Sequence, residues 1–222
     1  MTNLLVDTHT HLYDPVFDPD RTAVLENAER VGVGAVITVS EDLNDAERTL
    51  ELAGRHKMIR PAAGLYPTIL DNHQADRMEA FIRNHRMELA AIGEVGLDYW
   101  KVKEPEDKEI QRNIFGRFID LSKELKMPLN VHSRSAGRHA VNLLLESSAT
   151  RVQMHAFDGK ASAALPAVEA GQRLSHQVIR LVICIIKGPI LTCRVGGHRI
   201  AGWPATIATC YHRASVVKRV AG

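Results

Sequence analysis

Short apolar runs alternate with amphipathic stretches along the first 170 residues. Residues 35–39 form a β-branched run that is typical of a buried strand. Residues 21–31 carry apolar side chains at helical spacing, which indicates a helix with one buried face. The same criteria predict strands at residues 4–6, 35–39, 59–65, 89–92, 129–131 and 152–154, and helices at residues 21–31, 43–56, 75–86, 106–126, 138–146 and 161–170.

The predicted elements make six strand-then-helix units in a row. Alternation of this kind predicts a parallel sheet covered by helices. Strands this short and apolar are typically buried on both faces. An open doubly wound sheet and a closed (β/α)8 barrel both fit this pattern, so the pattern alone leaves the two architectures open.

The composition changes abruptly near residue 171. Residues 1–170 contain 20 Lys and Arg and 26 Asp and Glu, whereas residues 171–222 contain 8 Lys and Arg and no Asp or Glu. One explanation is a basic surface tail; the one we favour is an alternative exon or a shifted reading frame. We therefore expect a β/α domain at residues 1–171 and a divergent basic segment at residues 172–222.

Composition says little about partners, since the formal net charge is only +2. Three cysteines, Cys184, Cys193 and Cys210, give no disulfide framework and fit a reducing compartment. The first residues lack the basic and apolar parts of a signal peptide, and the longest apolar run is too short to span a bilayer. We expect an intracellular protein, cytoplasmic or nuclear, with no membrane association and no obligate protein partner.

Residues that can bind a metal lie at or just after predicted strand ends. His9 and His11 follow the first strand, and Glu94, His132 and His155 follow the fourth, fifth and sixth. In a parallel barrel all strands end on one face, so these side chains would converge. A single histidine at a strand end is usually structural, but four histidines with a carboxylate at matching positions favour a metal site.

The spacing of His9 and His11 strengthens this interpretation. Residues two apart on an extended strand point to the same side. Imidazoles combined with a carboxylate suit Zn²⁺, Mn²⁺ or Fe²⁺, and suit Mg²⁺ less well. Two histidines at this spacing are weak evidence for a metal site on their own. The evidence is stronger here because Glu94, His132 and His155 also lie at strand ends.

Four segments of the chain resemble, in order, the signature segments of the TatD DNase family, which belongs to the amidohydrolase superfamily. A longer stretch, residues 130–138, resembles one animal branch of that family, and the resemblance as a whole covers residue 4 to about residue 171. The four segments are Asp-Thr-His-Thr-His at 7–11, Gly-Glu-Val-Gly-Leu-Asp-Tyr at 93–99, Pro-Leu-Asn-Val-His-Ser-Arg at 128–134, and His-Ala-Phe-Asp-Gly at 155–159.

The resemblance implies a TIM-type (β/α)8 barrel with two divalent metal ions, such as Mg²⁺, Mn²⁺ or Zn²⁺. His9 and His11 would hold one ion, His132 and His155 the other, and Glu94 would bridge them and help to activate water. The implied reaction is hydrolysis of DNA phosphodiester bonds, usually as a 3′ exonuclease, and some family members act at abasic sites.

Three further residues take supporting roles by the same resemblance. Arg134 suits a phosphate contact, because its guanidinium can bind two phosphate oxygens at once. Asp7 and Asp98 would lie behind the metal ligands, where Asp98 could orient water or a histidine. A surface ion pair for Arg134 and a turn cap for Asp98 are the structural alternatives.

The sequence also departs from the family pattern. Tyr66 stands where the family often has a histidine, so we do not assign that residue's role here. The family has a metal-binding aspartate after the eighth strand that also serves as general base, but this chain has no Asp after Asp158 and no carboxylate side chain after Glu169. The metal site that needs this aspartate is therefore expected to be weakened.

The segment after residue 171 offers two apolar runs, residues 178–186 and 207–211, broken by glycine and proline. We therefore expect the barrel to be incomplete or irregular there. This leaves three functional hypotheses: a TatD-type deoxyribonuclease, a non-catalytic truncated isoform that retains partial metal binding, and a hydrolase of a small ester or amide.

Overall fold

The computed structural model describes residues 5–176, 194–195 and 198–199, and it shows the expected alternation of strands and helices. The strands are β1 (Leu5–Thr10), β2 (Val33–Thr38), β3 (Ile59–Ala63), β4 (Ala91–Gly96), β5 (Leu129–His132), β6 (Val152–Phe157) and β7 (Arg173–His176). The helices are the short 3-10 helix η1 (Pro15–Phe17), α1 (Arg21–Arg30), α2 (Leu43–Arg55), α3 (Asn72–Asn84), α4 (Pro105–Leu125), α5 (Gly137–Glu146) and α6 (Ala161–Glu169).

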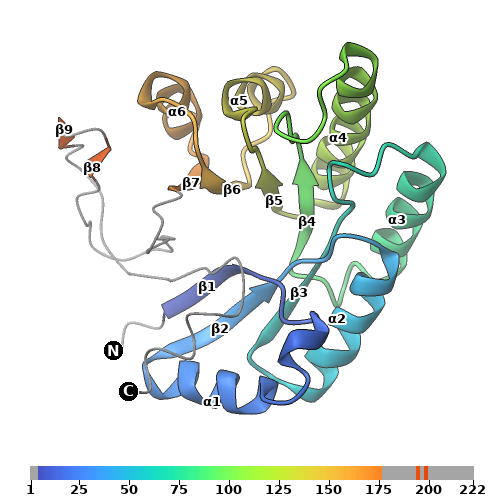
Figure 1. Ribbon diagram of the computed structural model, residues 1–222, viewed down its shortest axis with the longest axis vertical. Coiled ribbons are helices and arrows are strands. Elements are labelled where there is room, and N and C mark those ends of the chain that lie inside the picture. The colour runs from blue at the N-terminus through green and yellow to red at the C-terminus, as the bar shows by residue number, and fades with distance from the viewer. Residues whose placement is uncertain (1–4, 177–193, 196–197, 200–222) are drawn as a thin grey trace.

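Strands β1 to β7 form one sheet in which they lie side by side in chain order, and every neighbouring pair is parallel. The sheet curls, and helices α1 to α6 lie along its outer side (Figure 1). This confirms the TIM-type β/α architecture, in the form of a curled half barrel. Two short segments, β8 (Arg194–Val195) and β9 (His198–Arg199), form a separate antiparallel ladder.

The seventh strand was not predicted from the sequence. It follows Gly171, whose φ of +80° is a conformation that favours glycine, and pairs with β6 from Gln153 to Phe157. The first residues of the segment that we separated by composition therefore join the sheet. The two apolar runs expected to complete it, at 178–186 and 207–211, lie outside the described residues.

Apolar side chains from the outer helices fill the space between helix and sheet. Phe115 and Phe118 of α4 and Leu144 of α5 are fully buried in the same cluster as Val131 of β5 and Met154 of β6. Helix α4 begins with Pro105, followed by two acidic residues, which are favourable features of a helix start. This core fixes β4, β5 and β6 relative to one another.

Helix α4 is the longest described helix, with 21 residues, and it carries charged side chains throughout its length. In the part of the chain that the structure describes, no helix has the length and apolar character needed to cross a membrane.

Glycine allows the end of β3 to approach β4 closely. A Cβ atom on Gly64 would lie 2.5 Å from the carbonyl carbon of Gly93 and 2.7 Å from the backbone nitrogen of Glu94. The Gly64 backbone N–H also donates a hydrogen bond to the Ser40 hydroxyl, at 3.1 Å, which holds the Gly64 backbone in this position. Any larger residue at position 64 would therefore push on the backbone that carries Glu94.

We predict that Gly64→Ala destabilises the protein by roughly 1–3 kcal/mol, because its Cβ would overlap backbone atoms that cannot move independently. The matched control is Gly116→Ala, in helix α4, where a Cβ meets no atom within 4 Å. That change should stabilise the protein by about 0.5–1 kcal/mol, since alanine is the better helix former. Chemical denaturation measures both free energies of unfolding, and equal effects would contradict the predicted close approach.

Candidate metal centre

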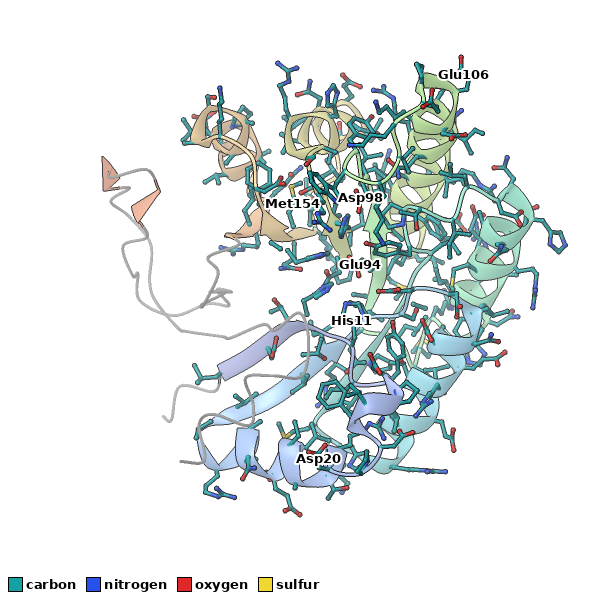
Figure 2. All side chains as sticks on the ribbon, in the orientation of Figure 1. His11, Asp20, Glu94, Asp98, Glu106 and Met154 are labelled. Atoms are coloured by element: carbon teal, nitrogen blue, oxygen red, sulfur yellow. The ribbon has the colours of Figure 1, made fainter. Side chains whose placement is uncertain are left out.

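The five expected metal-binding side chains come together on the inner side of the curled sheet. His9 lies in β1, Glu94 in β4, His132 at the end of β5 and His155 in β6, and His11 directly follows β1. Figure 2 shows Glu94 and His11 pointing toward one another inside the curve. Strands β1, β4 and β6 end later than predicted, so His9, Glu94 and His155 lie within their strands and not after them.

Glu94 is fully buried at the middle of this group. Its Oε1 atom lies 2.6 Å from Nδ1 of His132 and 3.0 Å from Nε2 of His155. Its Oε2 atom lies 3.5 Å from Nε2 of His11 and 3.7 Å from Nε2 of His9. The two carboxylate oxygens therefore face two different pairs of imidazoles.

The contacts of the Glu94 carboxylate indicate a metal-binding site. Its Oε2 atom is buried without a hydrogen-bond partner among the described residues, which is costly for a carboxylate oxygen. Ligand atoms of His9, His11 and Glu94 lie within 4.8 Å of one another, and so do those of Glu94, His132 and His155. Nitrogen and carboxylate donors in this number and spacing fit divalent metal binding.

Neighbouring side chains orient the ring of His9. Its Nδ1 lies 2.9 Å from Oδ1 of Asn130, whose amide N–H donates to the Thr8 carbonyl at 2.7 Å. Because the amide oxygen can only accept, the N–H of His9 is on Nδ1, and Nε2 keeps its lone pair. That lone pair faces Nε2 of His11, at 3.2 Å, on the side of Glu94.

His11 is oriented from its outer side. Its Nδ1 lies 3.3 Å from the Tyr13 hydroxyl and 3.7 Å from Oε1 of Glu41. An N–H on Nδ1 satisfies these oxygen neighbours and leaves the lone pair on Nε2. The electron pairs of His9, His11 and Glu94 thus converge, as metal ligands do.

His132 is held between two carboxylates. Its Nε2 lies 3.1 Å from Oδ2 of the fully buried Asp98, on the side opposite to Glu94. Asp98 is fixed in turn, since its backbone N–H donates to the side chain of Gln111 and its Oδ1 accepts from the Lys101 backbone. Both roles considered for Asp98, orienting a histidine and capping the following turn, are therefore compatible with the structure.

The close packing of histidines and carboxylates shifts the pKa values of Glu94, His9 and His132. Burial alone would raise the pKa of Glu94, but the charges of His155 and His9 and the hydrogen bond from His132 hold it well below its usual range. Burial, followed by the charge of His155, depresses the pKa of His9. Burial alone would lower the pKa of His132, but hydrogen bonds to Asp98 and Glu94 raise it to about 9. A metal ion at His132 would compete with that proton.

Sequence reasoning missed Asn130 and Glu41. Asn130 could have been found, because it precedes His132 by two residues on β5 and so shares its face. Glu41 gave no motif signal, yet it lies beside His11, and burial together with the charges of Glu94 and Asp45 raises its pKa to about 7.

The remaining expected residues lie around this centre. Asp7 accepts a hydrogen bond from the His9 backbone at 3.2 Å. Arg134 is exposed, and within the described residues it forms no ion pair, which disfavours the structural alternative. Tyr66 approaches His132, with 5.3 Å between ring centroids, and its hydroxyl lies 3.5 Å from Asp98.

Known proteins of similar sequence and fold identify the family of this chain. The human protein named deoxyribonuclease TATDN3 is 41% identical over 182 residues, covering 75% of this chain and 65% of its own length. A Xenopus laevis protein named putative deoxyribonuclease tatdn3-B is 38% identical, covering 76% and 64%. The crystal structure of YJJV, a TatD homologue from Escherichia coli, matches with a TM-score of 0.70 and 26% identity, covering 78% of this chain and 68% of its own.

The chain thus spans just under two thirds of the length of these two animal relatives. A family model described as TatD related DNase matches residues 6–182, beyond the point at which the recognisable motifs end. Most of the sequence is included in that match, together with all five converging side chains. The chain belongs to the TatD-related DNase family.

Proposed function

We propose that this chain is a metal-dependent hydrolase of DNA phosphodiester bonds that uses two divalent ions. The observation that carries the proposal is the placement of Glu94, a buried carboxylate with one oxygen facing each of two histidine pairs. A carboxylate placed in this way suits a bridge between two ions. DNA is the proposed substrate because the animal relatives are named as deoxyribonucleases.

In this proposal His9 and His11 would hold one ion, His132 and His155 would hold the other, and Glu94 would contribute to both sites. Divalent ions supply Lewis acidity and a nucleophile derived from water at neutral pH. Four imidazole donors favour Zn²⁺ or Mn²⁺ over Mg²⁺. Asn130 and Asp98 position the rings of His9 and His132, and Arg134 is available for a substrate phosphate.

We propose that the ion between His9 and His11 is held more weakly. The chain carries no Asp or Glu side chain after Glu169 to complete a site from its last residues. Solvent or substrate oxygens would then occupy the remaining coordination positions. A non-catalytic metal-binding protein is the second candidate, and this lack of carboxylates is the observation that favours it.

Within the nuclease proposal, attack from the 3′ end and cleavage at abasic sites are the two finer activities that we propose. Short single-stranded oligonucleotides labelled at either end, and a duplex with one abasic site, distinguish them. Products that shorten from the 3′ end support the first activity. A single cut at the abasic position supports the second.

We predict that Glu94→Gln lowers the rate of phosphodiester hydrolysis by at least about 100-fold, because it removes the charge shared by both ions. The measurement is release of nucleotides from an end-labelled oligonucleotide with added Mn²⁺ or Zn²⁺. A chelator should abolish the reaction in the unchanged protein, and added metal should restore it.

The matched control is Glu88→Gln, a change at an exposed carboxylate that pairs with His85 outside the site. Its activity should equal that of the unchanged chain. Metal binding without any hydrolysis by the unchanged chain would favour the non-catalytic candidate. Equal activity of Glu94→Gln and Glu88→Gln would overturn the proposed role of Glu94.

We predict that Asp98→Asn weakens metal binding roughly 10- to 100-fold, the usual effect of removing a carboxylate that orients a ligand histidine. Asparagine keeps the shape and can still accept from the Lys101 backbone, so the turn should persist. Competition with a chromophoric chelator measures the affinity. Asp71→Asn, at the exposed N-cap of α3, is the control, and a similar loss in both variants would contradict the prediction.

A further inference from the structure

An exposed aromatic side chain lies beside the metal centre, in contact with two cations. Trp100 follows β4 and is 56% exposed. The Arg134 guanidinium carbon lies 5.1 Å from the centre of its ring, and the Lys103 ammonium lies 5.3 Å from it. Contacts of this kind hold an exposed ring in place at modest energy.

The backbone connects this cluster to the metal-binding residues. Trp100 comes two residues after Asp98, and Arg134 comes two residues after His132. Between them, the Tyr99 backbone N–H donates to the Arg134 carbonyl at 3.0 Å. The loops after β4 and β5 are therefore fastened together at the end of the strands that carry Glu94 and His132.

A second aromatic and cation pair, Tyr66 and Lys101, contacts the metal centre itself. The Lys101 ammonium lies 5.2 Å from the centre of the Tyr66 ring, and that ring packs on His132. A ring and a cation thus lie directly against a proposed metal ligand, as a second pair of the same kind as that at Trp100.

The cations of this cluster keep their charge available to a ligand. Within the described residues, Lys101, Lys103 and Arg134 form no ion pair with a carboxylate, and among their charged groups only that of Lys103 donates a hydrogen bond, to the Tyr99 carbonyl. Lys108 adds positive charge next to this cluster, because its ammonium lies 5.2 Å from the centre of the ring of Tyr99, the neighbour of Trp100. This face would therefore attract a polyanion.

We propose that Trp100, Lys101, Lys103, Arg134 and Tyr66, here named the Trp100 platform, bind the terminal nucleotides of single-stranded DNA. A base stacks on the exposed face of Trp100, and Arg134 binds an adjoining phosphate. Single-stranded nucleic acid is recognised by this combination of aromatic faces and cations, whatever its base sequence. The inference rests on the proposed function, and it specifies an unpaired DNA end as the substrate.

The test is a binding measurement on the full chain with a fluorescently labelled ten-nucleotide oligothymidylate, in a chelator that prevents cleavage. Trp100→Ala should weaken binding at least about five-fold, the lower end of the usual contribution from one stacked base. Trp100→Phe should retain most of the affinity, because it keeps an aromatic face. The control is Met87→Ala, at a side chain that is 86% exposed and forms no part of the platform.

An oligomer of the same length without bases separates stacking from phosphate binding. Trp100→Ala should bind this probe as the unchanged chain does, whereas Arg134→Ala should bind both probes more weakly. Equal binding of oligothymidylate by Trp100→Ala and the unchanged chain would overturn the proposal, and so would an equal loss on the base-free probe. Hydrolysis with added metal is measured separately, so a chain that binds through Trp100 but never cleaves would refute the proposed function alone.

Discussion

The rest of the site depends on one constraint, the burial of the Glu94 carboxylate. A charged group away from water is strongly destabilising unless opposite charges or donors surround it. Here four imidazoles from three strands and one adjoining loop point at its two oxygens, and they keep its pKa low despite burial. The same imidazoles and carboxylate fit divalent metal ions. The histidines that stabilise the buried charge of Glu94 are therefore also suited to bind metal.

The β/α architecture surrounds the buried Glu94 carboxylate with histidines carried on short strands. Strands β1, β4, β5 and β6 bring His9, Glu94, His132 and His155 together on the inner side of the sheet. The outer helices pack apolar side chains against the strands. Asn130 and Asp98 then fix two of the rings through hydrogen bonds, so the geometry does not depend on exposed, flexible residues. Close backbone approach at Gly64 brings the end of β3 against the segment that bears Glu94.

Much of this arrangement could be predicted from the sequence, because helices and buried strands leave strong periodic patterns. The predicted helix at residues 43–56 corresponds to α2, Leu43–Arg55, and the motif histidines converge as the strand order requires. The missed features depend on contacts between distant residues. Asn130 acts on a histidine 121 positions earlier in the chain, and the neighbours of Trp100 appear only when two loops meet. Strand β7 is short, and its sequence, Arg-Leu-Ser-His, has little β-branched character.

The proposed function requires that Glu94 contribute to two metal sites at once. Anomalous X-ray diffraction from crystals of the full chain grown with Mn²⁺ tests it most directly. We expect two peaks about 3.5–4 Å apart, one beside His9 and His11, the other beside His132 and His155, with Glu94 between them. A single peak, or two peaks that Glu94 does not bridge, would contradict it.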